Sequence, residues 1–434
     1  MRGMKDSNYS WLGVIPQEWE IKRVKYVFDR KNEKAKQEKP SILSLARSGV
    51  KIRDISNNEG QIAESYYNYN PVEIDDLLIN PMDLYSGANC SISHVEGVIS
   101  PAYINLRTKV GYNPRYYDYY FKIQYWSMAF FSHGKGVSFE NRWTLNTETL
   151  MNYPVICPPH DVQIKIANYL DDKCKKINKM IAKEQEEIEK VQEYKQSIIT
   201  ETVTKGIYDT EKYKKSEIEW IKEIPEKWKV RKLKYLFKFV KGLPITKDDL
   251  KESGVPVISY GQIHSKLNDG VNIRPELIRY VDKNYIKTNM NSLVKENDFI
   301  FADTSEDLEG CGNCVFIDDD YDYLFAGYHT IIFDNKSKEN NKYFAYLFKT
   351  NLWRSQIRLR VSGIKLFSIT QKILKEITLI IPTRNEQEKI IELLDARCSK
   401  IEILINDKKN IIEKLQEYKK SLIYECVTGK KEIR

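Results

Sequence analysis

Long apolar runs are missing from this 434-residue sequence. No stretch approaches the length of a membrane-spanning helix, and the opening Met1 to Asp6 leads into no apolar signal-peptide core. The seven cysteines are odd in number and scattered along the chain, which indicates reduced thiols rather than a disulfide framework. We therefore expect a cytoplasmic protein with no part in the membrane.

Motifs of catalysis are also missing. There is no Gly-(x)4-Gly-Lys-Ser/Thr phosphate loop and no Gly-rich cofactor loop. The nearest string to the Asn/Asp-Pro-Pro-aromatic motif of adenine methyltransferases is Cys157 to His160, which lacks both the amide or acid and the aromatic ring. The five histidines form no ligand cluster, and Cys311 with Cys314 has the spacing of half a zinc site without a second pair, so a turn with free thiols is favoured. We expect no catalysis, cofactor or metal in this chain.

Two stretches of the sequence are near copies of each other. Gln163 to Thr204 and Gln387 to Thr428 are identical at half of their positions, which indicates an internal duplication. In each copy apolar residues recur at steps of four and three, the spacing of a coiled-coil seam. The seam comprises Leu170, Cys174, Ile177, Ile181, Ile188, Val191 and Ile198 in the first copy, and Leu394, Cys398, Ile401, Ile405, Ile412, Leu415 and Leu422 in the second.

The ends of these stretches also predict helices. Thr383 and Glu386 have the spacing of a capping box, in which a hydroxyl and a carboxylate satisfy amides of the first turn. Gly206 and Gly429 lie just past the apolar pattern, where a left-handed residue can end a helix. Each helix should be on the order of 60 Å long.

A second repeat precedes each domain. Trp11 to Trp19 returns as Trp220 to Trp228, so the duplicated unit consists of a lead-in, a domain and a long helix. We interpret the tryptophans as packing anchors. The division is a lead-in at 1–21, a first domain at 22–155, a central long helix at 156–206, a linker with the second lead-in at 207–230, a second domain at 231–378 and a C-terminal long helix at 379–434.

The two domains hardly match in sequence, yet both mix strand and helix patterns. Short β-type runs are broken by Gly, Asn and Asp, and one aromatic helical stretch lies in each domain, at Arg115 to Phe131 and at Lys342 to Arg360. The strand-like runs are Val72 to Asn80, Gly97 to Leu106, Val255 to Tyr260 and Asp298 to Ala302. The predicted fold class is α+β, with two mixed α/β domains separated by the two long helices.

The order of the segments predicts how the helices pair. A compact domain cannot easily carry the chain back along so long a helix, so the two helices should form an antiparallel coiled coil with a pseudo-twofold axis across its middle. One seam position is polar in both copies, Glu184 in the first and Lys408 in the second. We predict an ion pair between them that fixes the register.

The net charge of +8 is not evenly spread. Each long helix contains equal numbers of basic and acidic side chains, so the positive excess lies in the other segments. Those are the segments that a bound polyanion would touch, although +8 on a chain of this length is also an ordinary value.

These features together resemble a known family. The lead-in Trp-(x)3-Ile-Pro-(x)2-Trp, the pair of diverged domains and a Pro-(x)4-Gln start of each long helix, at 158–163 and 382–387, resemble the specificity subunit of type I restriction-modification enzymes over the whole chain. The resemblance implies that each domain is a target-recognition domain reading one half of a two-part sequence in double-stranded DNA. It also implies that the helices set the gap and dock two modification subunits.

The same resemblance assigns the chemistry to partners. The modification subunits would methylate adenine N6 with S-adenosylmethionine, and restriction subunits would add translocation and cleavage that use ATP and Mg. This chain would be their non-catalytic reader.

Base reading needs forked donors and acceptors, and phosphate contacts need basic or hydroxyl side chains in loops. Such residues gather around glycine-containing loops of the first domain, where the 44–53 and 80–87 segments are similar to segments of the family. The candidates are Ser44, Arg47, Lys51, Arg53, Asn80, Met82, Asp83, Tyr85, Ser86, Lys135, Ser138, Asn141 and Arg142.

The candidates in the second domain are Ser259, Tyr260, Gln262, Lys266, Thr304, Ser305, Arg354, Arg358, Arg360 and Lys365. Taken singly, a solvated loop side chain explains each candidate more simply; as sets they favour DNA binding. The tyrosine runs at 66–69 and 116–120 are better explained by packing than by base stacking.

Two other functions stay open. The chain could be the recognition component of a different multi-subunit restriction system, or a coiled-coil adapter whose domains bind no DNA. A salt-dependent affinity for duplex DNA separates the adapter from the readers, because neutralising phosphates releases counterions.

Overall fold

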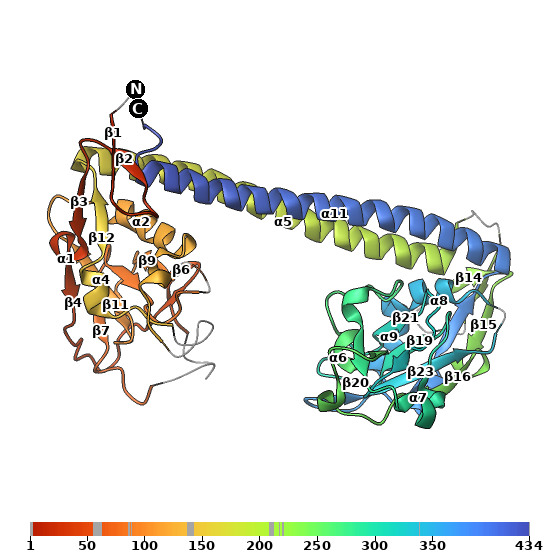
Figure 1. Cartoon of the computed structure of the whole chain (residues 1–434). Helices are drawn as coiled ribbons and strands as arrows, with labels where there is room; N and C mark the ends of the chain where they lie inside the picture. Colours follow the sequence, from red (N-terminus) through yellow and green to blue (C-terminus); the bar gives the residue numbers. More distant parts are fainter. Residues whose placement is uncertain are drawn as a thin grey trace. The chain divides into compact units, whose positions relative to one another are not determined.

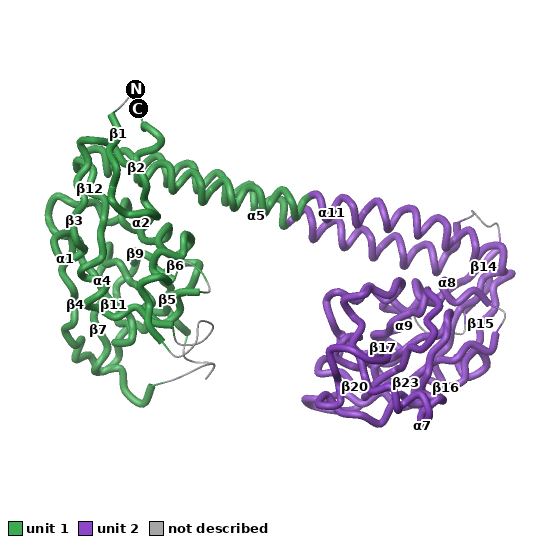
Figure 2. The backbone as a smooth tube through the Cα atoms, in the orientation of Figure 1, with its two compact units in different colours: residues 1–185, 408–434 green, residues 186–407 purple. Residues whose placement is uncertain are grey.

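The structure is a computed structural model that describes residues 3–54, 63–85, 87, 89–136, 143–207, 212–216, 218, 221–337 and 339–433. The chain forms two compact units, residues 1–185 with 408–434 (unit 1) and residues 186–407 (unit 2) (Figure 2). Each unit therefore combines one domain with the beginning of one long helix and the end of the other. None of the helices within the described ranges is long and apolar enough to cross a membrane.

The two predicted long helices are present as α5 (His160–Lys205) and α11 (Arg384–Val427) (Figure 1). At the start of α11, Glu386 Oε2 accepts from Thr383 N at 3.0 Å and from Thr383 Oγ1 at 2.6 Å. Gly206 and Gly429 follow the helices with φ of +82° and +72°. These glycines end the helices in the left-handed conformation that the sequence predicted.

Within each unit the two helices run antiparallel. In unit 1, Lys408 Nζ lies 2.9 Å from Glu184 Oε2 and Lys419 Nζ lies 2.7 Å from Asn178 Oδ1, so rising numbers on α11 meet falling numbers on α5. In unit 2, Ile199 and Val203 near the end of α5 share a core with Ile390 and Leu394 near the start of α11. The predicted seam residues Leu170, Cys174, Ile177, Leu394, Cys398, Ile401, Ile405 and Leu422 are buried.

Unit 1 contains a four-stranded antiparallel sheet of order β4-β11-β8-β9, with α2 (Pro114–Trp126) sharing its core. Its sheet strands are β4 (Phe28–Lys31), β8 (Leu77–Ile79), β9 (Cys90–Ile92) and β11 (Ile104–Thr108). The smaller pairs are β1 (Met4–Asp6) with β2 (Val14–Pro16), β3 (Glu20–Arg23) with β12 (Pro154–Cys157), β5 (Leu43–Ala46) with β6 (Gly49–Ile52), and β7 (Asn70–Val72) with β10 (Gly97–Ile99). The short helices are α1 (Val24–Val27), α3 (Ala129–Ser132) and α4 (Thr147–Met151).

Unit 2 repeats this plan with a four-stranded antiparallel sheet of order β16-β23-β19-β21. Its sheet strands are β16 (Phe237–Lys241), β19 (Phe299–Ala302), β21 (Cys314–Phe316) and β23 (Thr330–Asn335). The other strands are β13 (Tyr213–Lys215), β14 (Glu223–Pro225), β15 (Lys229–Lys232), β17 (Val255–Ile258), β18 (Arg279–Val281), β20 (Thr304–Ser305), β22 (Phe325–Ala326), β24 (Phe367–Ser368) and β25 (Thr378–Ile381).

The α-helices of unit 2 are short. They are α6 (Tyr260–Ile263), α7 (Tyr285–Thr288), α8 (Asn341–Phe348), α9 (Asn351–Arg358) and α10 (Gln371–Lys375). Single 3-10 turns lie at Leu233–Tyr235, Lys247–Asp249, Pro275–Leu277 and Met290–Ser292.

The two central sheets share one topology. In each sheet the first strand along the chain pairs with the last, the last pairs with the second, and the second pairs with the third. Two domains that hardly match in sequence therefore share one sheet topology, because short continuous apolar runs can specify a buried sheet without fixing the residues of its loops.

The lead-in tryptophans pack where each long helix ends. Trp19 is 1% exposed, and a Cβ on Gly429 would lie 2.8 Å from its ring. Trp228 is fully buried, and a Cβ on Gly206 would lie 3.2 Å from its ring. The interpretation of these tryptophans as packing anchors is confirmed; Trp220 lies outside the described residues.

The aromatic helix of each domain docks on the long helices through a repeated set of hydrogen bonds, which we call the docking frame. In unit 1, Gln163 Oε1 accepts from Asn113 N at 2.8 Å, Tyr116 OH donates to Val427 O at 2.8 Å and Tyr119 OH donates to Asp171 at 2.8 Å. The expectation that the tyrosines at 116–120 pack rather than stack on bases is confirmed for Tyr116, Tyr117 and Tyr120, which are fully buried.

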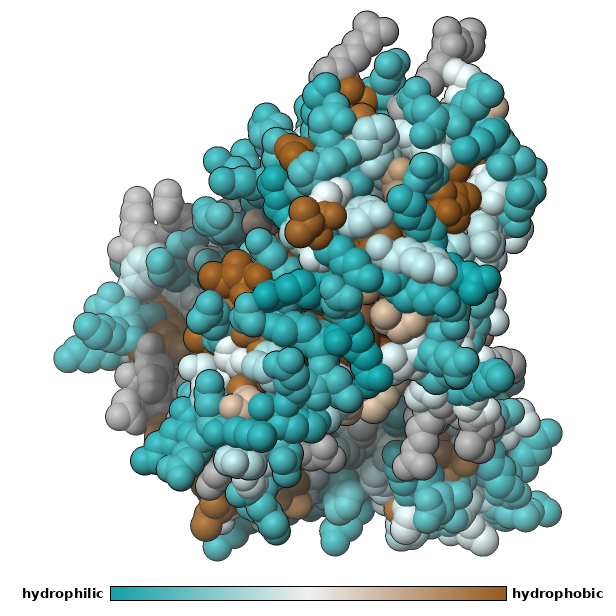
Figure 3. Space-filling model, turned by 90° about the vertical axis from the view of Figure 1, so that its left-hand side faces the viewer, coloured by the Kyte–Doolittle hydropathy of each residue, from teal (hydrophilic) through white to brown (hydrophobic). Residues whose placement is uncertain are grey.

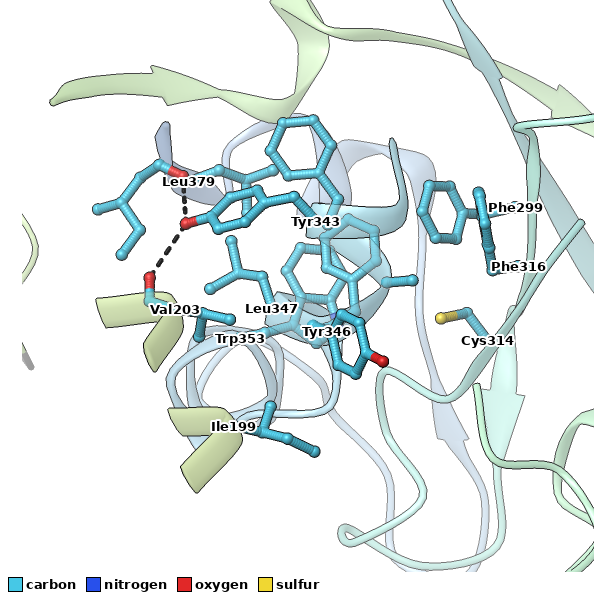
Figure 4. Packing of buried hydrophobic residues seen from close by; sticks show 14 of the residues in the cluster. Ile199, Val203, Phe299, Cys314, Phe316, Tyr343, Tyr346, Leu347, Trp353 and Leu379 are labelled. Carbon is cyan, nitrogen blue, oxygen red and sulfur yellow. Dashed lines mark hydrogen bonds between the residues drawn. The ribbon is translucent and has the colours of Figure 1, made fainter. Parts of the chain in front are cut away.

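Unit 2 makes the equivalent contacts. Tyr343 OH donates to Val203 O at 3.0 Å (Figure 4). Gln387 Oε1 accepts from Asn340 N at 2.9 Å, and Tyr346 OH donates to Asp395 at 2.5 Å. The identities between the two helix copies thus include the residues that hold a domain, Gln163 with Gln387 and Asp171 with Asp395.

We predict that Lys408→Glu lowers the free energy of unfolding by about 1–3 kcal/mol, because it places two carboxylates together in a half-buried seam. The side chains of Lys408 and Glu184 are only 14% and 22% exposed. Thermal unfolding followed by circular dichroism measures the loss, and adding Glu184→Lys should restore stability. Lys176→Glu, which removes a pair between exposed side chains, is the control. Equal losses in both variants would exclude a role of the pair in setting the register.

Candidate nucleic-acid interface

The β5–β6 hairpin carries the first group of candidates. Its inner face is anchored by Leu43 and Leu45, which are buried in a small core. Ser44 pairs with Lys51 across the strands, and Arg47 lies in the two-residue turn that closes the hairpin. Arg47 and Lys51 are exposed. The hairpin therefore holds two cations on a rigid, strand-supported edge. Arg53, half-buried, follows β6.

The candidates in the loop after β8 fall into two groups: some form hydrogen bonds that hold the loop, and others are exposed to solvent. Asn80 Oδ1 accepts from Met82 N at 3.0 Å, and Asp83 Oδ2 accepts from Asn89 Nδ2 at 3.1 Å. These two side chains hold the loop, whereas Met82 and Tyr85 are 44% and 62% exposed. Ser86 lies outside the described residues.

Lys135 marks the base of another loop of unit 1. It forms an isolated bridge with Thr144, with both backbone hydrogen bonds at 2.9 Å, and its side chain is exposed. The candidates Ser138, Asn141 and Arg142 lie outside the described residues.

In unit 2 the structure divides the candidates between interior and surface. Ser259 is fully buried and Ser305 is 1% exposed. Gln262 Oε1 accepts from Ser259 N at 3.1 Å, and the carbonyl of Thr304 lies 3.0 Å from His264 Nε2. The side chain of Lys266 is exposed. Of these candidates, Lys266 is the one that faces solvent.

A pocket of about 540 Å³ brings together Tyr260, Ser305 and Arg354, which are far apart in the sequence. Its lining also includes the carboxylates of Glu306, Asp307 and Glu309. Tyr260 OH donates to Glu306 Oε1 at 3.2 Å. The pocket is therefore acidic. Its carboxylates were not predicted, because base reading was expected from forked cations and amides and phosphate contact from basic or hydroxyl side chains. Carboxylate oxygens accept from exocyclic amino groups such as cytosine N4.

The arginines of α9 hold the loop at the rim of this pocket. Arg354 donates through NH1 to Glu309 O at 2.8 Å, and Arg358 donates to Leu308 O at 2.8 Å and to Glu309 O at 3.0 Å. Arg360 donates to Gln356 O at 2.7 Å within its own segment. Beyond it, Lys365 is exposed. The structure thus gives Arg354 and Arg358 loop carbonyls as partners and leaves Lys365 on the surface.

One face of the molecule is mostly polar. The face shown in Figure 3 is mostly hydrophilic, and its apolar residues form small, separate patches. Within the described ranges, no group of three or more His, Cys, Asp or Glu side chains is arranged to hold a metal ion. Cys311 and Cys314 are both buried, and burial raises the pKa of the Cys314 thiol to about 12.

Comparison with known proteins places this architecture. The model of the type I restriction modification DNA specificity domain matches residues 225–414. Over these residues, which span the second domain and the first part of α11, the chain is similar to the type I restriction-modification specificity proteins. The type I restriction enzyme MjaVIII specificity subunit of Methanocaldococcus jannaschii is 22% identical over 100% of this chain and 98% of its own length. The putative type I restriction enzyme MjaX specificity subunit of the same organism is 25% identical over 99% and 98%.

A solved structure supports the fold. One chain from a study of complex assembly and conformational transition of the type I R-M system superposes with a TM-score of 0.67, at 13% identity, over 95% of this chain and 98% of that chain. The fold of sheet domains and long helices is therefore shared with that chain at a sequence identity of only 13%.

We predict that Arg358→Lys loosens the loop at 306–310, because an ammonium group cannot reproduce the planar fork that serves two carbonyls. Amide hydrogen exchange should become faster at Gly310 and Cys311, which donate to Asp307 and to Leu308. Arg360→Lys, at a side chain that donates to Gln356 O within its own segment, is the control. Unchanged exchange in the loop would show that Arg358 does not hold it.

Proposed function

We propose that this chain is the DNA-reading subunit of a type I restriction-modification enzyme, and that each domain reads one half of a two-part duplex sequence. One observation carries the proposal: a single docking frame, repeated contact for contact, holds two domains of the same fold with different loop chemistry. A protein that reads two unlike half-sites needs this combination.

The two domains offer different chemistry to DNA. The first domain presents the exposed cations Arg47, Lys51 and Lys135 on its hairpin and loop base. The second presents a carboxylate-lined pocket, with Lys266 and Lys365 exposed in neighbouring loops. We assign the cations to phosphates and to guanine edges, and the carboxylates to amino groups of cytosine or adenine.

Partner docking is assigned to the long helices. Tyr194 and Tyr418 occupy equivalent repeat positions and are 60% and 55% exposed, and the equivalent Met180 and Leu404 are 53% and 44% exposed. Two matching sets of exposed apolar side chains support two copies of one partner, which we propose to be modification subunits that methylate adenine N6 with S-adenosylmethionine. Restriction subunits with ATP and Mg would complete the enzyme, so this chain would recognise and its partners would catalyse.

The first test is a selection of bound duplexes from a random library, with this chain co-purified with its modification subunit. We expect a two-part motif with a constant gap. Exchange of the first domain for that of another family member should change one half of the motif and leave the other unchanged. A bound pool without any motif would contradict the proposal and favour the adapter function.

Deletion of residues 181–187 and 405–411 tests whether the helices set the gap. These heptads occupy equivalent repeat positions around the Glu184–Lys408 contact, so the deletion preserves the phase of the seam. It removes about 10 Å of helix, which corresponds to about three base pairs. The same selection should return both half-sites with a changed gap. Altered half-sites with an unchanged gap would refute the spacer role.

A further inference from the structure

A basic cleft lies in unit 1 where the hairpin meets the paired long helices. It has a volume of about 690 Å³ and is lined by the hairpin tip, α2, α5 and the C-terminal part of α11. Four of its side chains are cations, Arg47, Lys122, Lys419 and Lys420, and none of the described residues that line it is acidic. The cleft therefore brings Arg47, a candidate DNA-binding residue, together with lysines of the C-terminal helix α11.

The cations of the cleft are only partly neutralised by the protein. Lys122 Nζ lies 2.5 Å from Asp118 Oδ2, which compensates its charge. Lys419 Nζ donates to the neutral Asn178 Oδ1 at 2.7 Å, and Lys420 Nζ lies 5.9 Å from the centre of the Trp126 ring. Burial lowers the pKa of Lys419, and nearby Lys122 lowers it further. An anion in the cleft would remove this repulsion.

The duplicated frame provides an internal comparison, because the lysine of unit 2 that corresponds to Lys419 is paired with a carboxylate. There Lys195, the counterpart of Lys419, has its Nζ 2.7 Å from the carboxylate of Glu402, the counterpart of Asn178. Gln196 takes the place of Lys420. Asn178 for Glu402 and Lys420 for Gln196 each add one positive charge, so these two positions on the long helices carry two more positive charges in unit 1 than in unit 2.

We propose that this cleft binds the phosphodiester backbone of the duplex read by the first domain, with Lys419 and Lys420 of α11 contacting two adjacent phosphates beside Arg47 of the hairpin. The inference rests on the proposed function and adds to it. A long helix that would otherwise serve as spacer also binds DNA, and it does so for one of the two half-sites.

The rest of the lining fits a phosphate rather than a base. Ser48 offers a hydroxyl and Gln416 an amide, both of which commonly contact phosphate oxygens. Gly49 and Gly87 line the cleft with backbone alone, and their φ of +107° and +120° lie in a region that favours glycine. Such contacts position the duplex without reading its sequence. They should therefore raise affinity for all sequences alike.

The experiment measures the affinity of the chain, with its modification subunit, for a duplex carrying the selected motif as salt concentration is varied. Lys419→Gln with Lys420→Gln should weaken binding on the order of tenfold and reduce the slope of log K against log salt by about two, since each phosphate contact contributes about 0.9. Asn178→Glu, which gives Lys419 the carboxylate that Lys195 has, should reduce the slope by about one. Lys176→Gln, an exposed lysine outside the cleft, should leave the slope unchanged.

The outcomes separate this inference from the proposed function. If the double variant binds the duplex as tightly as the wild-type protein, with the same slope and the same melting temperature, the assignment of the cleft to DNA is wrong. The proposed function is then unaffected. If the wild-type protein shows no salt-dependent binding to the duplex, both the cleft assignment and the proposed function are wrong. If the wild-type protein binds inorganic phosphate and the double variant does not, while the slope of log K for DNA against log salt is the same in both, the cleft binds a free anion. That result would overturn the DNA assignment. If the double variant no longer binds the modification subunit but keeps the wild-type slope, the cleft is part of the surface that binds this subunit. That result would also overturn the DNA assignment.

Discussion

The fold depends on the way in which each domain is tied to both long helices at once. A glutamine side chain at the start of one helix accepts from the amide that begins the domain's aromatic helix, and a tyrosine of that aromatic helix donates to a carbonyl at the end of the other long helix. Because these partners are buried, leaving one of them unsatisfied would cost about 1–3 kcal/mol. The domain is thereby held to a helix pair rather than to its own helix alone.

This constraint explains which residues are identical in the two copies and which differ. Gln163, Asp171 and their counterparts in the second copy are retained because each has a partner in its domain. Loop residues have no such partner in common, so the first unit presents cations on a hairpin while the second presents carboxylates in a pocket. One frame can therefore support two unlike surfaces, which is what reading two unlike half-sites requires.

Much of the architecture was predictable because it rests on periodicity. The alternating steps from Leu170 onward gave the helices, and Gly206 and Gly429 gave their ends. The order of the segments gave the antiparallel pairing. The candidate site was predictable only in part. The arginines of α9 have the residue type of a base reader, yet Arg354 and Arg358 donate to the loop carbonyls of Glu309 and Leu308. Sequence gives the donor but not the acceptor that folding brings to it.

The sequence alone determined the repeated unit, the seam and the absence of recognisable catalytic motifs, because these are encoded locally by spacing and residue type. Tertiary structure decided the local charge. Each long helix is neutral when its side chains are counted along the chain, yet folding sets Lys419 and Lys420 beside Arg47 and Lys122, whereas the counterpart Lys195 meets Glu402. Electrostatic interactions fall off with distance in space, so a charge count along a helix cannot show which charges become neighbours.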